Sequence, residues 1–158
     1  MSAITKCQIR FLLGYATTQI LTLFLRNNFF KGQIPCETIQ IRHLDLSQNS
    51  LSGSLPSWSS ERLEQLHLGQ NNFSGSIPEA FFNISRLWTL DISDNRLSGR
   101  IPSAIGELWG LRILLLRGNR LSGEISTQLC QMGEYKLNGS LQQLPFWYDT
   151  SLLSSYFL

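Results

Sequence analysis

One sequence template recurs in five consecutive blocks of this chain, and no other feature constrains the fold as strongly. The blocks are ILTLFLRNNFFKGQIP (20–35), IRHLDLSQNSLSGSLP (41–56), LEQLHLGQNNFSGSIP (63–78), LWTLDISDNRLSGRIP (87–102) and LRILLLRGNRLSGEIS (111–126). Their shared asparagines are separated by 21, 22, 24 and 24 residues. A regular period of this length indicates a solenoid, in which each repeat buries its apolar face only against its neighbours.

Each block predicts a short strand followed by a turn. In the L-x-L part, Leu44 and Leu46 would point inward and their neighbours outward, because successive strand side chains face opposite ways. The asparagine amide would satisfy backbone groups left unpaired by the turn, so that stacked copies form a ladder. The ladder residues are Asn28, Asn49, Asn71, Asn95 and Asn119.

Glycine and proline complete the template. A glycine follows four residues after each asparagine, where a turn needs backbone freedom, at Gly32, Gly53, Gly75, Gly99 and Gly123. Segments 79–87 and 103–111 space apolar residues every three and predict 3₁₀ or short helical turns on the opposite, convex side. A leucine heptad in one long helix is excluded, because these glycines and the prolines of four blocks would break it.

The composition agrees with a narrow solenoid core. The 158 residues include 28 leucines and 13 isoleucines but no valine, whereas an ordinary buried parallel sheet is rich in valine and isoleucine. With 42% hydrophobic and 15% charged residues, the chain is too apolar for a disordered segment. The 13 basic and 11 acidic residues are scattered singly, which argues against nucleic acid as a partner.

The turn motifs LSGSLP, FSGSIP, LSGRIP and LSGEIS resemble the plant-specific class of leucine-rich repeat. Residues 111–141 are similar to the membrane-distal repeats of plant receptor-like proteins, and the resemblance covers about residues 20–141. It implies an α/β horseshoe with short parallel strands on the concave face and 3₁₀ or short helical turns on the convex face. It also implies a non-enzymatic module that recognises a peptide or protein in cell-surface signalling or defence, without cofactors.

The resemblance further implies an extracellular ligand, a co-receptor kinase as partner, and a place at the outer face of the plasma membrane or in the secretory pathway. The sequence divides into a degenerate repeat or weak signal-like segment (1–19), five repeats (20–126), a truncated sixth repeat (127–144) and a non-repeat tail (145–158). No apolar run reaches the roughly 18 residues of a membrane span. The pattern is therefore interpreted as a truncated receptor-like ectodomain segment.

Two other functions stay open at this point. One is a secreted inhibitor of cell-wall-degrading enzymes, similar to polygalacturonase inhibitors, which uses the same repeat type. The other is a truncated product without an independent function, which the missing caps and the half-deleted sixth repeat favour.

The outward positions of the strands are the predicted ligand-binding surface, because such surfaces combine exposed polar and aromatic side chains on a rigid scaffold. In register, His67 lies between Asp45 and Asp91, which would allow a pH-sensitive contact. We expect neither catalysis nor metal binding there, since no nucleophile and no convergent ligand set accompany these residues. The candidate contacts are Phe24, Arg26, His43, Asp45, Gln65, His67, Thr89, Asp91, Leu115 and Arg117.

Three N-x-S sequons mark candidate glycosylation sites at Asn72, Asn83 and Asn138. Asn83 is the best of them, because it falls on a predicted convex segment away from the binding face. The three cysteines, Cys7, Cys36 and Cys130, match no metal or redox spacing, and free thiols or a link between the first two both stay open. The tryptophans receive no functional role.

Overall fold

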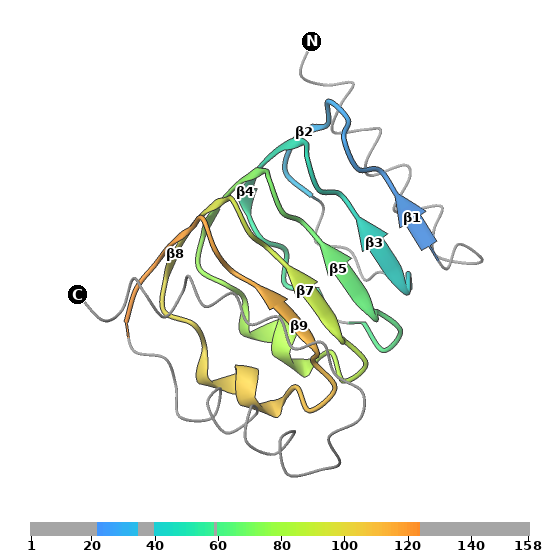
Figure 1. The fold of residues 1–158 in the computed structure, drawn as a ribbon, viewed down its shortest axis with the longest axis vertical. Helices are drawn as coiled ribbons and strands as arrows, with labels where there is room; N and C mark the ends of the chain where they lie inside the picture. Colours follow the sequence, from blue (N-terminus) through green and yellow to red (C-terminus); the bar gives the residue numbers. More distant parts are fainter. Residues whose placement is uncertain (1–21, 35–39, 59, 124–158) are drawn as a thin grey trace.

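A computed structural model describes residues 22–34, 40–58 and 60–123, which form a parallel-strand solenoid. Its first sheet has five parallel strands that follow one another in chain order, as Figure 1 shows from blue to orange. The strands are β1 (Thr22–Phe24), β3 (His43–Asp45), β5 (Gln65–His67), β7 (Thr89–Asp91) and β9 (Ile113–Leu115). The predicted solenoid and its L-x-L strands are confirmed, and Leu44, Leu46, Leu66 and Leu68 are fully buried.

A second parallel sheet follows the asparagine turn, where the sequence predicted only a turn. It consists of β2 (Lys31–Gly32), β4 (Ser50–Ser54), β6 (Asn72–Gly75), β8 (Arg96–Gly99) and β10 (Arg120–Leu121), in the order β10-β8-β6-β4-β2. Each strand pairs with its counterpart in the neighbouring repeat, offset by two template positions, which supplies the hydrogen bonds that a turn would have made locally. The expected freedom of the glycines is nevertheless used, because Gly53 and Gly75 have φ values of 90° and 84°.

Two 3₁₀ helices lie on the side away from the first sheet, in agreement with the predicted helical turns. They are η1 (Glu79–Asn83) and η2 (Ser103–Glu107), each preceded by a proline, and Figure 1 shows them stacked in consecutive repeats. Trp58, in the preceding repeat, is 1% exposed and stacks on Phe81 of η1 with ring centroids 6.3 Å apart. This tryptophan is therefore a core residue.

The asparagine ladder joins neighbouring repeats through both the oxygen and the nitrogen of four side-chain amides. Asn95 Oδ1 accepts the backbone N–H of Phe73 at 3.0 Å, and its Nδ2 donates to the carbonyl oxygen of Leu68 at 3.0 Å. The same two contacts recur at Asn49, Asn71 and Asn119 with the repeat before each. Asn28 donates within its own repeat, to the carbonyl oxygens of Leu25 and Arg26.

Candidate functional site

The outward side chains of the first sheet form rows that cross its strands, and we call this side the concave face. In one row the pairing places Phe24 beside Asp45, Asp45 beside His67, His67 beside Asp91, and Asp91 beside Leu115. We call these five residues the central row. The predicted position of His67 between two aspartates is thus the observed one.

Each aspartate of the central row is held by a serine two residues later in the chain, just beyond the end of the strand. Asp45 Oδ1 accepts the Ser47 backbone N–H at 2.9 Å and the Ser47 hydroxyl at 2.6 Å. Asp91 Oδ1 accepts the corresponding Ser93 groups at 3.0 and 2.7 Å. These carboxylates are therefore fixed by neutral donors just beyond the strand end, rather than being freely solvated side chains.

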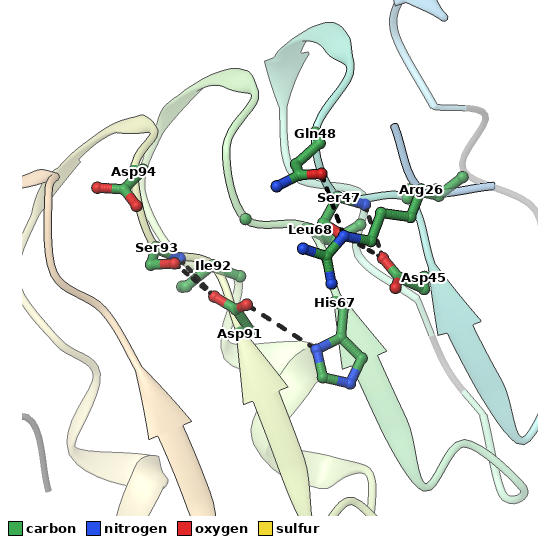
Figure 2. Close-up of polar contacts among 12 residues, drawn as sticks. Arg26, Asp45, Ser47, Gln48, His67, Leu68, Asp91, Ile92, Ser93 and Asp94 are labelled. Carbon is green, nitrogen blue, oxygen red and sulfur yellow. Dashed lines mark hydrogen bonds and ion pairs between the residues drawn. The ribbon is translucent and has the colours of Figure 1, made fainter. Parts of the chain in front are cut away.

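His67 is engaged on one side only. Its Nδ1 lies 3.9 Å from Asp91 Oδ2, and Figure 2 shows the ring turned toward Asp91 while Asp45 faces Ser47. A glycine makes room for this arrangement, since a Cβ on Gly69 would lie 2.9 Å from Asp91 Oδ1 and 3.0 Å from Ser93 Oγ. The third repeat carries H-x-G where its neighbours carry D-x-S, and the Asp91 carboxylate occupies the space left by the missing side chain.

The environment of Asp91 has opposing effects on its ionisation. Burial raises the pKa of this carboxyl, but the nearby His67 imidazole and the hydrogen bonds from Ser93 outweigh burial and leave the pKa below its ordinary value of 3.8. Asp91 is therefore ionised throughout the neutral and mildly acidic range.

A second histidine contact lies beside the central row. His43 Nε2 is 3.4 Å from Glu64 Oε2, and Arg42 Nε is 3.8 Å from Glu64 Oε1. Each histidine of the chain thus contacts a carboxylate from the following repeat. Sequence reasoning missed Glu64, although its place just before Gln65, the residue that pairs with His43, could have drawn attention to it.

The end of the concave face nearest the asparagine ladder carries two arginines. Arg26 Nε donates to Gln48 Oε1 at 3.1 Å, and Arg117 Nε lies 4.0 Å from Asp94 Oδ2. The residue before the ladder asparagine has a left-handed backbone in every repeat, and four of these residues are not glycine. They are Asn27, Gln48, Gln70 and Asp94, with φ values of 51° to 57°.

The residues predicted to contact a ligand differ in how much of each side chain is exposed. Phe24 is the most exposed of the central row at 67%, whereas Thr89 on the same face is only 3% exposed. Thr89 therefore contributes almost no surface to a ligand. Arg26 and Arg117 are exposed, and the other candidates, His43, Asp45, Gln65, His67, Asp91 and Leu115, are half-buried.

The arrangement is suited to hydrogen bonds and ion pairs with a ligand. Among residues 22–34, 40–58 and 60–123, no three histidine, cysteine, aspartate or glutamate side chains gather as metal ligands would. Cys7, Cys36 and Cys130 and their pairing lie outside the described residues, as do Asn138 and the predicted segments 1–19, 127–144 and 145–158.

Two family models described as leucine-rich repeat match the chain, over residues 40–61 and 61–121. Together they span residues 40–121, which is more than half of the 158 residues. The chain belongs to the leucine-rich repeat family. No curated protein matches it.

The solved structures similar to this leucine-rich repeat chain include plant receptor ectodomains. The plant peptide hormone receptor RGFR1, in complex with RGF2, is 33% identical with a TM-score of 0.66, covering 70% of this chain and 19% of that one. A chain of the BIR3–SERK2 complex from Arabidopsis thaliana is 40% identical with a TM-score of 0.64, covering 69% and 61%. The SOBIR1 ectodomain from Arabidopsis thaliana is 33% identical with a TM-score of 0.60, covering 70% and 63%.

These likenesses make the chain a plant receptor-like leucine-rich repeat segment. It spans 19% of the length of the RGFR1 chain and 61% of the length of the chain from the BIR3–SERK2 complex. Within the described part of the leucine-rich repeat, no helix has the length and hydropathy of a membrane span. Asn83, at the end of η1, is exposed on the convex side, whereas Asn72 is half-buried in β6.

Proposed function

We propose that this leucine-rich repeat segment is a non-enzymatic recognition module that binds a peptide or protein on its concave face. The observation that carries the proposal is the central row, where five strands in register present an exposed aromatic side chain and half-buried acidic, imidazole and apolar side chains on one sheet face. A rigid sheet loses little conformational entropy on binding, which favours recognition by such a surface.

The similar solved structures support this role and its partners. RGFR1 is in complex with RGF2, and the GASSHO1/SCHENGEN3 ectodomain, 34% identical to this chain, is in complex with CASPARIAN STRIP INTEGRITY FACTOR 2. HAESA, 30% identical, is in complex with a peptide hormone and the co-receptor SERK1. By extension, the partners of this chain are an extracellular peptide or protein and a co-receptor kinase, in cell-surface signalling or defence. The receptor relatives favour this function over an inhibitor of cell-wall-degrading enzymes.

A displayed library of random dodecapeptides tests the concave face as the binding surface. Peptides selected on the full chain are then offered to a His67→Ala variant and to a Trp109→Ala variant. Trp109 is the matched control because it is 72% exposed and follows η2 on the convex side. We expect the selected peptides to lose affinity for His67→Ala and to keep it for Trp109→Ala. Equal binding to both variants would contradict the proposed surface.

The extracellular location has its own test. If the chain enters the secretory pathway, Asn83 receives a glycan, since its side chain is exposed at the end of η1. The protein from a plant host should then shift in electrophoretic mobility after glycosidase treatment, and Asn83→Gln should lose that shift. A product whose mobility neither treatment nor substitution changes would count against glycosylation at this position.

A further inference from the structure

The central row has an apolar side chain at each end and charged ones between them. Phe24 stands at the β1 end and is 67% exposed, and Leu115 stands at the β9 end and is half-buried. Asp45 and Asp91 lie one strand inside these ends, on either side of His67. Figure 2 shows the three polar side chains projecting from neighbouring strands. A ligand complementary to this row has apolar groups at its two ends and basic groups between them.

The charge of the row is negative at neutral pH. Asp45 is held by the neutral donors of Ser47 and, among the described residues, forms no ion pair. The basic neighbour of Asp91 is His67, and because the row has two carboxylates and one imidazole, its net charge is negative in either protonation state of the imidazole. An acidic ligand would be repelled here, whereas a basic side chain supplies the missing counter-charge.

The position of that basic side chain follows from the strand spacing. Asp45 and Asp91 are two strands apart, about 9.6 Å, which is too far for one small ion to bridge. Each aspartate therefore takes a guanidinium or ammonium group of its own, one on either side of the His67 position. A side chain delivered from above by a ligand therefore fits the row better than a free cation does.

The ends of the row set the length of the ligand. Phe24 and Leu115 are four strand steps apart, about 19 Å, and an extended peptide covers about 20 Å in six residues. Since residues two apart share a face, apolar residues at i and i+6 would reach the two ends while i+2 and i+4 face the aspartates.

We infer that the concave face binds an extended peptide that crosses the strands, with apolar residues six positions apart and arginine or lysine at the two positions between them that face the aspartates. This inference rests on the proposed function and names the chemistry of its ligand. The occupant is a cationic peptide segment.

A synthetic heptapeptide provides the probe. It carries leucine at its two ends, arginine at the third and fifth positions and threonine elsewhere, and its partner peptide has glutamate in place of arginine. Fluorescence anisotropy with the full chain should show binding of the arginine peptide at least tenfold tighter than that of the glutamate peptide. Tighter binding of the glutamate peptide, or no binding of the arginine peptide at millimolar concentration, would overturn the inference.

Three variants test whether the negative charges of Asp45 and Asp91 account for the binding of the arginine peptide. Asp45→Asn and Asp91→Asn keep the oxygen that accepts the serine hydrogen bonds and remove only the negative charge. Their combination should weaken the arginine peptide about tenfold, since a partly exposed ion pair contributes up to about fivefold each. Glu107→Gln, which removes an exposed carboxylate of η2, should change the affinity less than twofold.

The outcomes separate this inference from the proposed function. If the library selection yields peptides that depend on His67 but show no enrichment of basic residues, the recognition surface stands and the cationic ligand is refuted. If the double aspartate variant binds the arginine peptide as well as the Glu107→Gln control does, the inference is refuted as well.

Discussion

Replacing one buried ladder asparagine tests whether the ladder stabilises the stack of repeats. Asn95 is 9% exposed, and its amide makes four contacts. Its Oδ1 accepts the Phe73 backbone N–H at 3.0 Å, and its Nδ2 donates to the carbonyl oxygens of Leu68, Ile92 and Ser93 at 3.0, 3.2 and 2.9 Å. Asn95→Ala removes all four at once.

The four losses are unequal, because the three carbonyl groups keep other partners. The remaining donors are Asn71 Nδ2 to Leu68, Asn119 Nδ2 to Ile92, and the Gln70 backbone N–H to Ser93. Only the buried N–H of Phe73 is left without its acceptor. A buried unsatisfied donor costs about 1–3 kcal/mol, so with the lost packing we expect Asn95→Ala to lower the free energy of unfolding by about 2–3 kcal/mol.

Urea denaturation followed by tryptophan fluorescence measures this change. Asn28→Ala is the matched control, since Asn28 is exposed and water can replace its two hydrogen bonds, and it should cost less than about 1 kcal/mol. Asn95→Asp keeps the acceptor for Phe73 but turns a negative oxygen toward three carbonyl groups, so it should cost at least as much as alanine. The reasoning is refuted if Asn95→Ala and Asn28→Ala cost the same, or if Asn95→Asp is the mildest change.

Three further predictions concern the backbone and the central row. Gln70→Gly should raise the free energy of unfolding by about 0.5–1 kcal/mol, since Gln70 has φ 55° and glycine adopts this backbone freely; a lower urea midpoint would contradict it. Gly69→Ala should lower it by about 1 kcal/mol, as the new Cβ meets the Asp91 carboxylate at 2.9 Å, and an unchanged midpoint would show that the carboxylate moves freely. Because the pKa of Asp91 is lowered by folding, its contribution is complete above 3.8 and is lost as the pH falls through the folded-state pKa. The stability difference between the protein and Asp91→Asn should therefore shrink between pH 5 and pH 2.5 in urea titrations, and a constant difference would refute this linkage.

Much of the concave face was predictable because strand periodicity is local. The L-x-L pattern places each outward residue by its offset from the buried leucines, and the constant template aligns these residues into rows, which the pairing of His67 with Asp45 and Asp91 confirms. The exposure of individual side chains was not predictable in the same way. Thr89 and Phe24 both occupy outward positions, yet one is 3% and the other 67% exposed, since neighbouring repeats decide how much of each remains open.

The second sheet and the contacts of the central row could not be predicted from the sequence of a single repeat. Strands such as β8 contain one buried apolar residue, Leu97, and a glycine, so their alternation is too short to distinguish a strand from a turn. They become strands because a segment with the same template lies alongside in the neighbouring repeat. The role of Gly69 is likewise not evident from its own repeat. It follows from the position of the Asp91 carboxylate in the next repeat, which a Cβ at residue 69 would contact.

The sequence by itself determined the solenoid, the inward lattice of leucines, the asparagine ladder and the order of residues along the central row. These features follow from spacing along one chain, because strand alternation and the repeat period are both counted in residues. Only the tertiary structure decided the second sheet, the burial of Thr89 and Trp58, and the contact of His67 with Asp91 rather than Asp45. Those features depend on side chains and backbone groups of neighbouring repeats, whose separation is set by how the repeats stack.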